Sequence, residues 1–200
     1  MRKPSTLALC VVCLFLLPSC SPRDFLTRRL AGDLIAASDT FGAPQRFQLR
    51  IGVVSNKDYL SPEYLELQHR GWISGSKAQC DTALGPPPCW DITLTPSGVD
   101  TFQSLIAPGD AEKQSFNIPA ARRELVAITG IAKLGNSAAV EFTWKWIPLN
   151  EVGAALYPAD TRYRSSASFR SYDDGWRLIE RVPHPPEAFD ESLKNAEPVR

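Results

Sequence analysis

Apolar and polar residues alternate most strictly in the carboxy-terminal half of the chain. In the stretch VEFTWKW, residues 140–146, the apolar positions include Trp144 and Trp146, with Glu, Thr and Lys between them. This period of two is typical of a strand with one buried face and one wet face. The turn sequences LGNS and DDG join strand-like segments in pairs, so we predict an antiparallel meander built from residues 124–134, 138–147, 165–174 and 175–182.

Apolar residues in the amino-terminal half repeat mostly with a helical period. Every fourth residue between 26 and 34 is Leu, which predicts a helix over residues 23–38. A second helix is expected over residues 61–71, with Ser61 as N-cap and Gly71 as the stop. Alternation predicts a strand over residues 46–54, and the remaining expected elements are two short strands and a helical segment at 71–74, 89–95 and 96–106.

These elements predict an α+β fold in which an amino-terminal helical part is followed by an antiparallel β-meander. We divide the chain into four parts. They are a signal peptide (1–19), a helical part with a small two-stranded wing and a disulfide loop (20–110), an antiparallel sheet (111–182) and a proline-rich tail (183–200).

The amino terminus has the layout of a signal peptide. Arg2 and Lys3 precede an uncharged apolar run over residues 7–17, which is shorter than the roughly 18 residues that a membrane-spanning helix needs. The sequence LPSC, ending at Cys20, resembles the lipobox of bacterial lipoproteins. The resemblance implies cleavage before Cys20 and acylation of its thiol and amine. The alternatives are an ordinary secreted protein cleaved nearby and a cytosolic protein with an apolar amino-terminal helix.

The lipobox resemblance implies a protein of the cell envelope that is attached to the membrane through acylated Cys20. Ser21 after the cysteine favours the outer membrane, facing the periplasm, in a host that has one. The chain has 22 basic and 22 acidic residues, and loss of Arg2 and Lys3 with the signal leaves a net charge of −2. This balance gives no electrostatic support for nucleic-acid binding, so the expected partners are the membrane and another envelope protein or a glycan.

Cys80 and Cys89 are the cysteines that follow Cys20 in the predicted mature chain. An envelope compartment oxidises thiols, and the GPPP turn between them can bring the two ends together. We therefore predict a disulfide that closes this loop. A catalytic dithiol is the rival interpretation, but it usually needs C-x-x-C spacing at the start of a helix.

Residues 61 to about 106 are ordered as helix, Gly, short strand, loop, strand, Leu-Thr-x-x-Gly and helix. The sequences LELQHRGWIS and WDITLTPSG in this order resemble the second half of winged-helix domains. In DNA-binding members, the helix that matches residues 61–71 would enter the major groove. Here that helix carries Glu63 and Glu66, and the signal peptide places the domain outside the cytoplasm. We therefore expect a scaffold that binds no nucleic acid.

Trp144 and Trp146 have two interpretations. They are either the core of a sheet that is covered on one side, or the lining of an exposed groove for a sugar or peptide. The strict alternation around them favours the core, and the groove is the candidate binding surface.

An envelope enzyme of hydrolase type is the alternative function. The chain contains two histidines, His69 and His184, and none of the common catalytic or phosphate-binding motifs. The carboxylates that could act in catalysis are Glu124, Glu141, Asp173 and Asp174. No metal or cofactor is expected, because the paired Asp residues lack the further oxygen ligands of a calcium loop. The sequence favours a binding or structural role.

Overall fold

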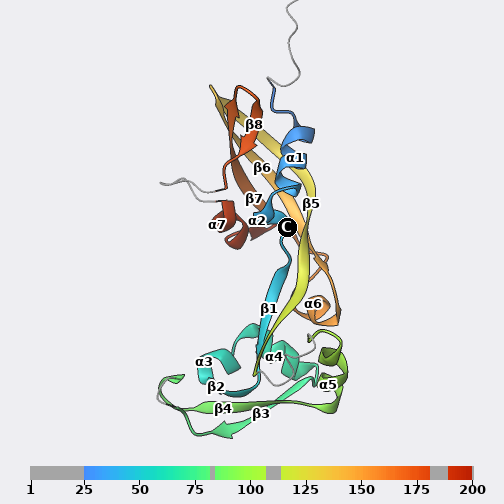
Figure 1. The fold of residues 1–200 in the computed structure, drawn as a ribbon, viewed down its shortest axis with the longest axis vertical. Helices are drawn as coiled ribbons and strands as arrows, with labels where there is room; N and C mark the ends of the chain where they lie inside the picture. The colour runs from blue at the N-terminus through green and yellow to red at the C-terminus, as the bar shows by residue number, and fades with distance from the viewer. Residues whose placement is uncertain (1–24, 82–83, 107–113, 181–188, 200) are drawn as a thin grey trace, which may run out of the picture.

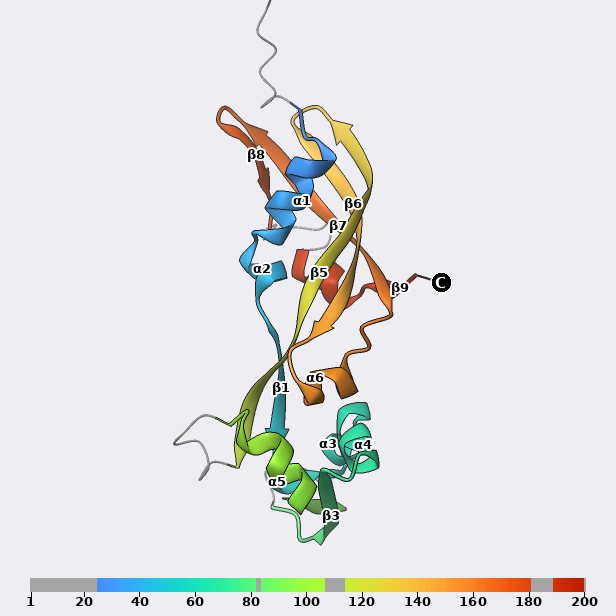
Figure 2. The same cartoon turned by 90° about the vertical axis from the view of Figure 1, so that its right-hand side faces the viewer.

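The computed structural model describes residues 25–81, 84–106, 114–180 and 189–199. The molecule is elongated, with an upper lobe and a lower lobe between which two paired strands run (Figures 1 and 2). It contains helices and two antiparallel sheets, so the prediction of a mixed fold is confirmed. The sheet exceeds the predicted meander, because strands from both ends of the chain join it.

The large sheet forms the upper lobe and the connection to the lower lobe. Its strands are β1 (Gln45–Arg50), β5 (Ser115–Leu134), β6 (Ser137–Pro148), β7 (Arg162–Tyr172), β8 (Gly175–Leu178) and β9 (Glu197–Pro198). The order is β1-β5-β6-β7-β8, and β9 pairs with β7 beyond the end of β8. Gly135 and Gly175 have φ angles of 59° and 130°, which a glycine adopts without strain, so both predicted tight turns form.

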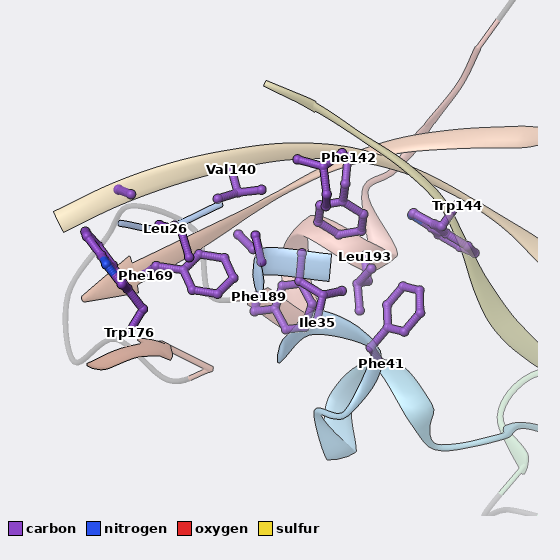
Figure 3. Close-up of a cluster of buried hydrophobic side chains, with 14 of the residues drawn as sticks. Leu26, Ile35, Phe41, Val140, Phe142, Trp144, Phe169, Trp176, Phe189 and Leu193 are labelled. Carbon is purple, nitrogen blue, oxygen red and sulfur yellow. The ribbon is translucent and has the colours of Figure 1, made fainter. Parts of the chain in front are cut away.

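Three helices cover one face of this sheet in the upper lobe. They are α1 (Arg28–Ala36), α2 (Asp39–Gly42) and α7 (Phe189–Lys194). The apolar side chains of β6 point toward these helices and pack with their apolar faces (Figure 3). The central members of this upper core are Ile35, Phe41, Val140, Phe142, Trp144, Phe169, Phe189 and Leu193.

The lower lobe is a three-stranded sheet with helices above it (Figure 1). The strands are β2 (Gly52–Ser55), β3 (Ile73–Ala78) and β4 (Cys89–Leu94), in the order β2-β4-β3. The helices are α3 (Asn56–Tyr59), α4 (Pro62–His69), α5 (Pro96–Gln103) and α6 (Glu151–Leu156). The two strands of the expected wing correspond to β3 and β4, and β2 joins them as a third strand. A second core fills this lobe, with Leu49, Leu67, Ile92, Phe102, Ile118 and Val152 fully buried.

The strand expected over residues 46–54 is in fact two strands in two sheets. The chain turns at Gly52, where φ is 80°, so β1 pairs with β5 while β2 pairs with β4. The backbone N–H of Ile51 lies between the two strands and donates to the Gln114 carbonyl at 2.9 Å. The alternation of apolar and polar residues continues through residues 50–52, so Gly52 is the one sequence signal of the break between the two strands.

Strand β5 supplies side chains to both cores. Ile118 and Ala120 are buried in the lower core, whereas Ala121 and Ile128 are buried in the upper core. Because successive residues of a strand point to opposite faces, the two cores lie on opposite sides of β5.

Candidate interaction surfaces

The structure assigns the two tryptophans of β6 to the core. Trp144 is 1 % exposed and Trp146 is 9 % exposed, and their rings meet edge to face at 4.9 Å. Burial of this extent fits the core interpretation and leaves no exposed groove at these side chains. Cys20 and His184 lie outside the described residues.

Trp144 takes part in a buried polar chain that holds α7 against β7. Its Nε1 donates to Ser165 Oγ at 3.0 Å, and the Ser165 hydroxyl donates to the Ser192 carbonyl at 2.9 Å. The Ser166 backbone N–H then donates to Ser192 Oγ at 2.8 Å. The Trp144 N–H and both serine hydroxyls of this chain thereby have partners, which avoids the cost of leaving them unpaired.

Arg123 of β5 stands opposite Trp146 of β6 and packs on both indoles. Its guanidinium carbon is 5.5 Å from the Trp144 ring centre and 4.9 Å from that of Trp146. Nη1 donates to the Thr40 carbonyl at 3.2 Å, while the buried Nε has no hydrogen-bond partner among the described residues. Burial lowers the pKa of Arg123. The contacts fix α2 to the sheet, which is a structural role that no local sequence pattern indicates.

The Cys80–Cys89 disulfide is present, with the two Cα atoms 5.2 Å apart. Cys89 begins β4 and is fully buried, so the bond attaches the loop directly to the lower sheet. The expected pairing is therefore confirmed. Its position at the end of two paired strands fits a role in holding the loop.

Next to the disulfide, two aromatic rings stack at the edge of the lower lobe. The Tyr59 and Trp90 ring centres are 4.2 Å apart with planes 13° from parallel. Trp90 Nε1 donates to Asn56 Oδ1 at 2.9 Å. Gly75 lies under the Tyr59 ring, and a side chain there would collide with it, since an added Cβ would be 2.4 Å from Tyr59 Cε2. Both rings are half-buried.

The opposite face of the lower sheet is not covered by α3 and α4, which lie above the sheet in Figure 1. Val53, Ser74, Ser76 and Thr93 are exposed on it. The hydroxyls of Ser74 and Thr93 are hydrogen-bonded across the strands at 2.9 Å. This open face, which we call the lower face, is rich in hydroxyl groups and carries the half-buried Asp91, which stands opposite Val53 and Ser76.

The candidate catalytic carboxylates do not converge. Glu124 forms an ion pair with Lys145 across the strands at 3.1 Å. Glu141 is four residues from Lys145 along β6, about 13 Å at the usual rise of a strand. Asp174 is paired with Arg177 at the β7–β8 turn, where the Arg177 side chain lowers the pKa of that carboxyl.

His69 is exposed at the end of α4 and lies 3.9 Å from Glu66. No group of three or more potential metal ligands occurs within residues 25–81, 84–106, 114–180 and 189–199. Of the residues that the sequence singled out for catalysis, Glu124, Glu141, Asp174 and His69 therefore do not come together in the described part of the chain.

Comparison with protein-family models, curated proteins and solved structures finds no match for this chain. In the described part of the chain, no helix is long and apolar enough to cross a membrane.

Proposed function

We propose that this protein is a lipid-anchored protein of the cell envelope with a binding or structural role, held to the membrane through acylated Cys20. In a host with an outer membrane, it is attached to that membrane and faces the periplasm. The partner at the far end is another envelope protein or a glycan.

The position of the amino-terminal helix is the observation that best supports this proposal. Helix α1 begins at Arg28, eight residues after Cys20, at the upper end of the molecule. The lower lobe lies at the opposite end (Figures 1 and 2). An anchor at Cys20 would thus attach the upper end and direct the lower lobe away from the bilayer.

The anchor is tested by metabolic labelling with a radioactive fatty acid. The wild-type protein should incorporate the label and sediment with membranes, while Cys20→Ala should remain unlabelled and keep its uncleaved signal. Cys10→Ser is the matched control, because this cysteine would leave with the signal peptide. An unlabelled wild-type protein in the soluble fraction would overturn the proposal.

The binding role is tested with a photo-crosslinking amino acid at Ser76, on the lower face. The control is the same group at Glu141, which is exposed on the outer face of the large sheet. Adducts with an envelope component should form from position 76 and not from position 141. Adducts from neither position would argue against a partner at the lower face.

A further inference from the structure

The upper end of the molecule consists of two hairpin turns that are bonded to each other. The Ser171 N–H, next to the β7–β8 turn, donates to the Asn136 carbonyl of the β5–β6 turn at 2.7 Å. Figures 1 and 2 show both hairpins reaching the end of the molecule at which α1 begins. We call this end the hairpin end.

Apolar side chains are exposed at the hairpin end. Leu134, beside the first turn, is 84 % exposed, and Tyr172, beside the second, is 43 % exposed. Phe25, which leads into α1, is 55 % exposed. Single exposed apolar residues are ordinary on a soluble protein, but here they lie on both faces of one tip: Phe25 is beside Lys133 on the helix-covered face, and Leu134 and Tyr172 are on the opposite face.

A cation lies beside two of these apolar side chains, Phe25 and Tyr172. Lys133 Nζ lies 5.1 Å from the Phe25 ring centre and 5.4 Å from that of Trp176. Arg177 stacks over Tyr172 at 4.9 Å and pairs with Asp174. Aromatic rings with a cation beside them are typical of the boundary between headgroups and acyl chains.

Arg170 stands directly opposite Arg177 in the β7–β8 pair. Like charges at opposed positions of a sheet repel one another. Asp174 balances Arg177, but Arg170 has no ion pair within the described residues. An anionic group outside the chain would neutralise it, and the phosphate of a phospholipid has the required charge.

We propose that the hairpin end is a membrane-contacting surface, with Leu134 entering the headgroup region and Lys133 and Arg170 at the lipid phosphates. The inference rests on the proposed anchoring at Cys20. Four residues lie between Cys20 and Phe25, so the five steps of covalent chain limit their distance to about 18 Å. The anchor therefore keeps this end, and not the lower face, within reach of the headgroups.

The acylated full-length mature protein in phosphatidylethanolamine–phosphatidylglycerol vesicles tests this surface. An environment-sensitive fluorophore is attached at Leu134→Cys or, as the matched control, at Ser76→Cys on the lower face. Quenching by lipids that carry a nitroxide near the headgroup should be roughly twofold or more stronger at position 134 than at position 76. Combining Lys133→Gln and Arg170→Gln with the label at position 134 should reduce the quenching at that position.

The outcomes separate this inference from the anchoring proposal. Vesicles that float with the protein but quench positions 134 and 76 equally would overturn the membrane-contacting surface and leave the anchor in place. A wild-type protein that does not float with the vesicles would overturn the anchor itself. In native membranes, a photo-crosslinker at position 134 that captures protein and no lipid would also overturn the membrane-contacting surface.

Discussion

The Trp144 indole and the Ser165 hydroxyl form a buried hydrogen bond of 3.0 Å between neighbouring strands of the large sheet. The hydroxyl also donates to the backbone of α7, at Ser192. One small side chain therefore satisfies two groups that water does not reach, and it connects the sheet to a helix that follows it by more than twenty residues.

Ser165→Ala should lower the free energy of unfolding by about 1–3 kcal/mol, because it leaves the Trp144 N–H without an acceptor and removes the donor to Ser192. Urea unfolding measures the change. Ser166→Ala is the matched control, since that side chain is exposed and its backbone N–H stays in place. It should change stability by no more than about 0.5 kcal/mol. Equal losses in both variants would contradict the role given to Ser165.

Trp144→Ala should cost about 3–5 kcal/mol, the usual effect of emptying a buried aromatic site. The lost contacts include Phe41, Tyr163 and the Arg123 guanidinium. Thermal unfolding measures the melting temperature of this variant. Leu134→Ala, at an exposed position, is the control and should leave the melting temperature nearly unchanged. An unchanged melting temperature for Trp144→Ala would mean that the indole is not part of the core.

Gly153→Ala should destabilise the protein by about 3 kcal/mol or more, because α6 packs directly on the backbone of β5. An added Cβ would collide with the Ala120 carbonyl, at 1.8 Å from its oxygen. Gly42→Ala makes the same chemical change in α2, where the nearest atom is the Ala36 carbonyl oxygen at 3.6 Å. That control should be neutral or gain up to about 1 kcal/mol from helix propensity. Chemical denaturation measures the free energy of unfolding of both variants. Equal stabilities for Gly153→Ala and Gly42→Ala would contradict the close packing of α6 on β5.

Tyr64 should make the protein less stable at alkaline pH. Its hydroxyl accepts from the Arg50 N–H at 2.7 Å and donates to the Arg50 carbonyl at 3.0 Å. Burial raises the pKa of Tyr64 above the ordinary 10.0, so the unfolded chain loses this proton first. The contribution to stability is complete below about pH 10 and is lost as the pH rises through the folded-state pKa.

Stability measured between pH 8 and 12 tests this dependence. Tyr64→Phe should be less stable at pH 8 but should lose less stability on further alkalinisation than the wild type does. Tyr172→Phe, at an exposed position, should follow the wild-type curve. Parallel curves for Tyr64→Phe and the wild type would contradict the assignment to Tyr64.

Replacing both Cys80 and Cys89 by Ala should cost about 2–3 kcal/mol, the chain-entropy estimate for a loop of this size. Reduction should destabilise the wild type by a similar amount and leave the double variant unchanged. A non-reduced digest analysed by mass spectrometry should contain the crosslinked peptides. Free thiols at both positions in protein taken directly from the envelope would contradict the disulfide.

Local signals in the sequence predicted the hairpins, the caps and the disulfide well. Ser61 caps α4 by accepting from the Tyr64 N–H, and Gly135 makes the first turn. These features depend on residues close together in the chain. The lipobox at Cys20 stays a prediction.

What the sequence did not predict depends on distant contacts. The break at Gly52 interrupts a regular alternation because the two halves of the stretch find different partner strands. The sequence pattern indicated no role for Arg123, and its partial burial comes from packing on indoles that are more than twenty residues away. Neither outcome is visible in a local pattern.

Strand β5 has a consequence for how the protein unfolds. It is a single element of 20 residues whose two ends line different cores. Melting one lobe would remove the partners from half of this strand and expose apolar side chains on it, so the lobes should not melt independently. A single cooperative transition is therefore expected despite the elongated shape. A pull on the lower lobe would be carried along one continuous backbone to the hairpin end, where we propose the anchor.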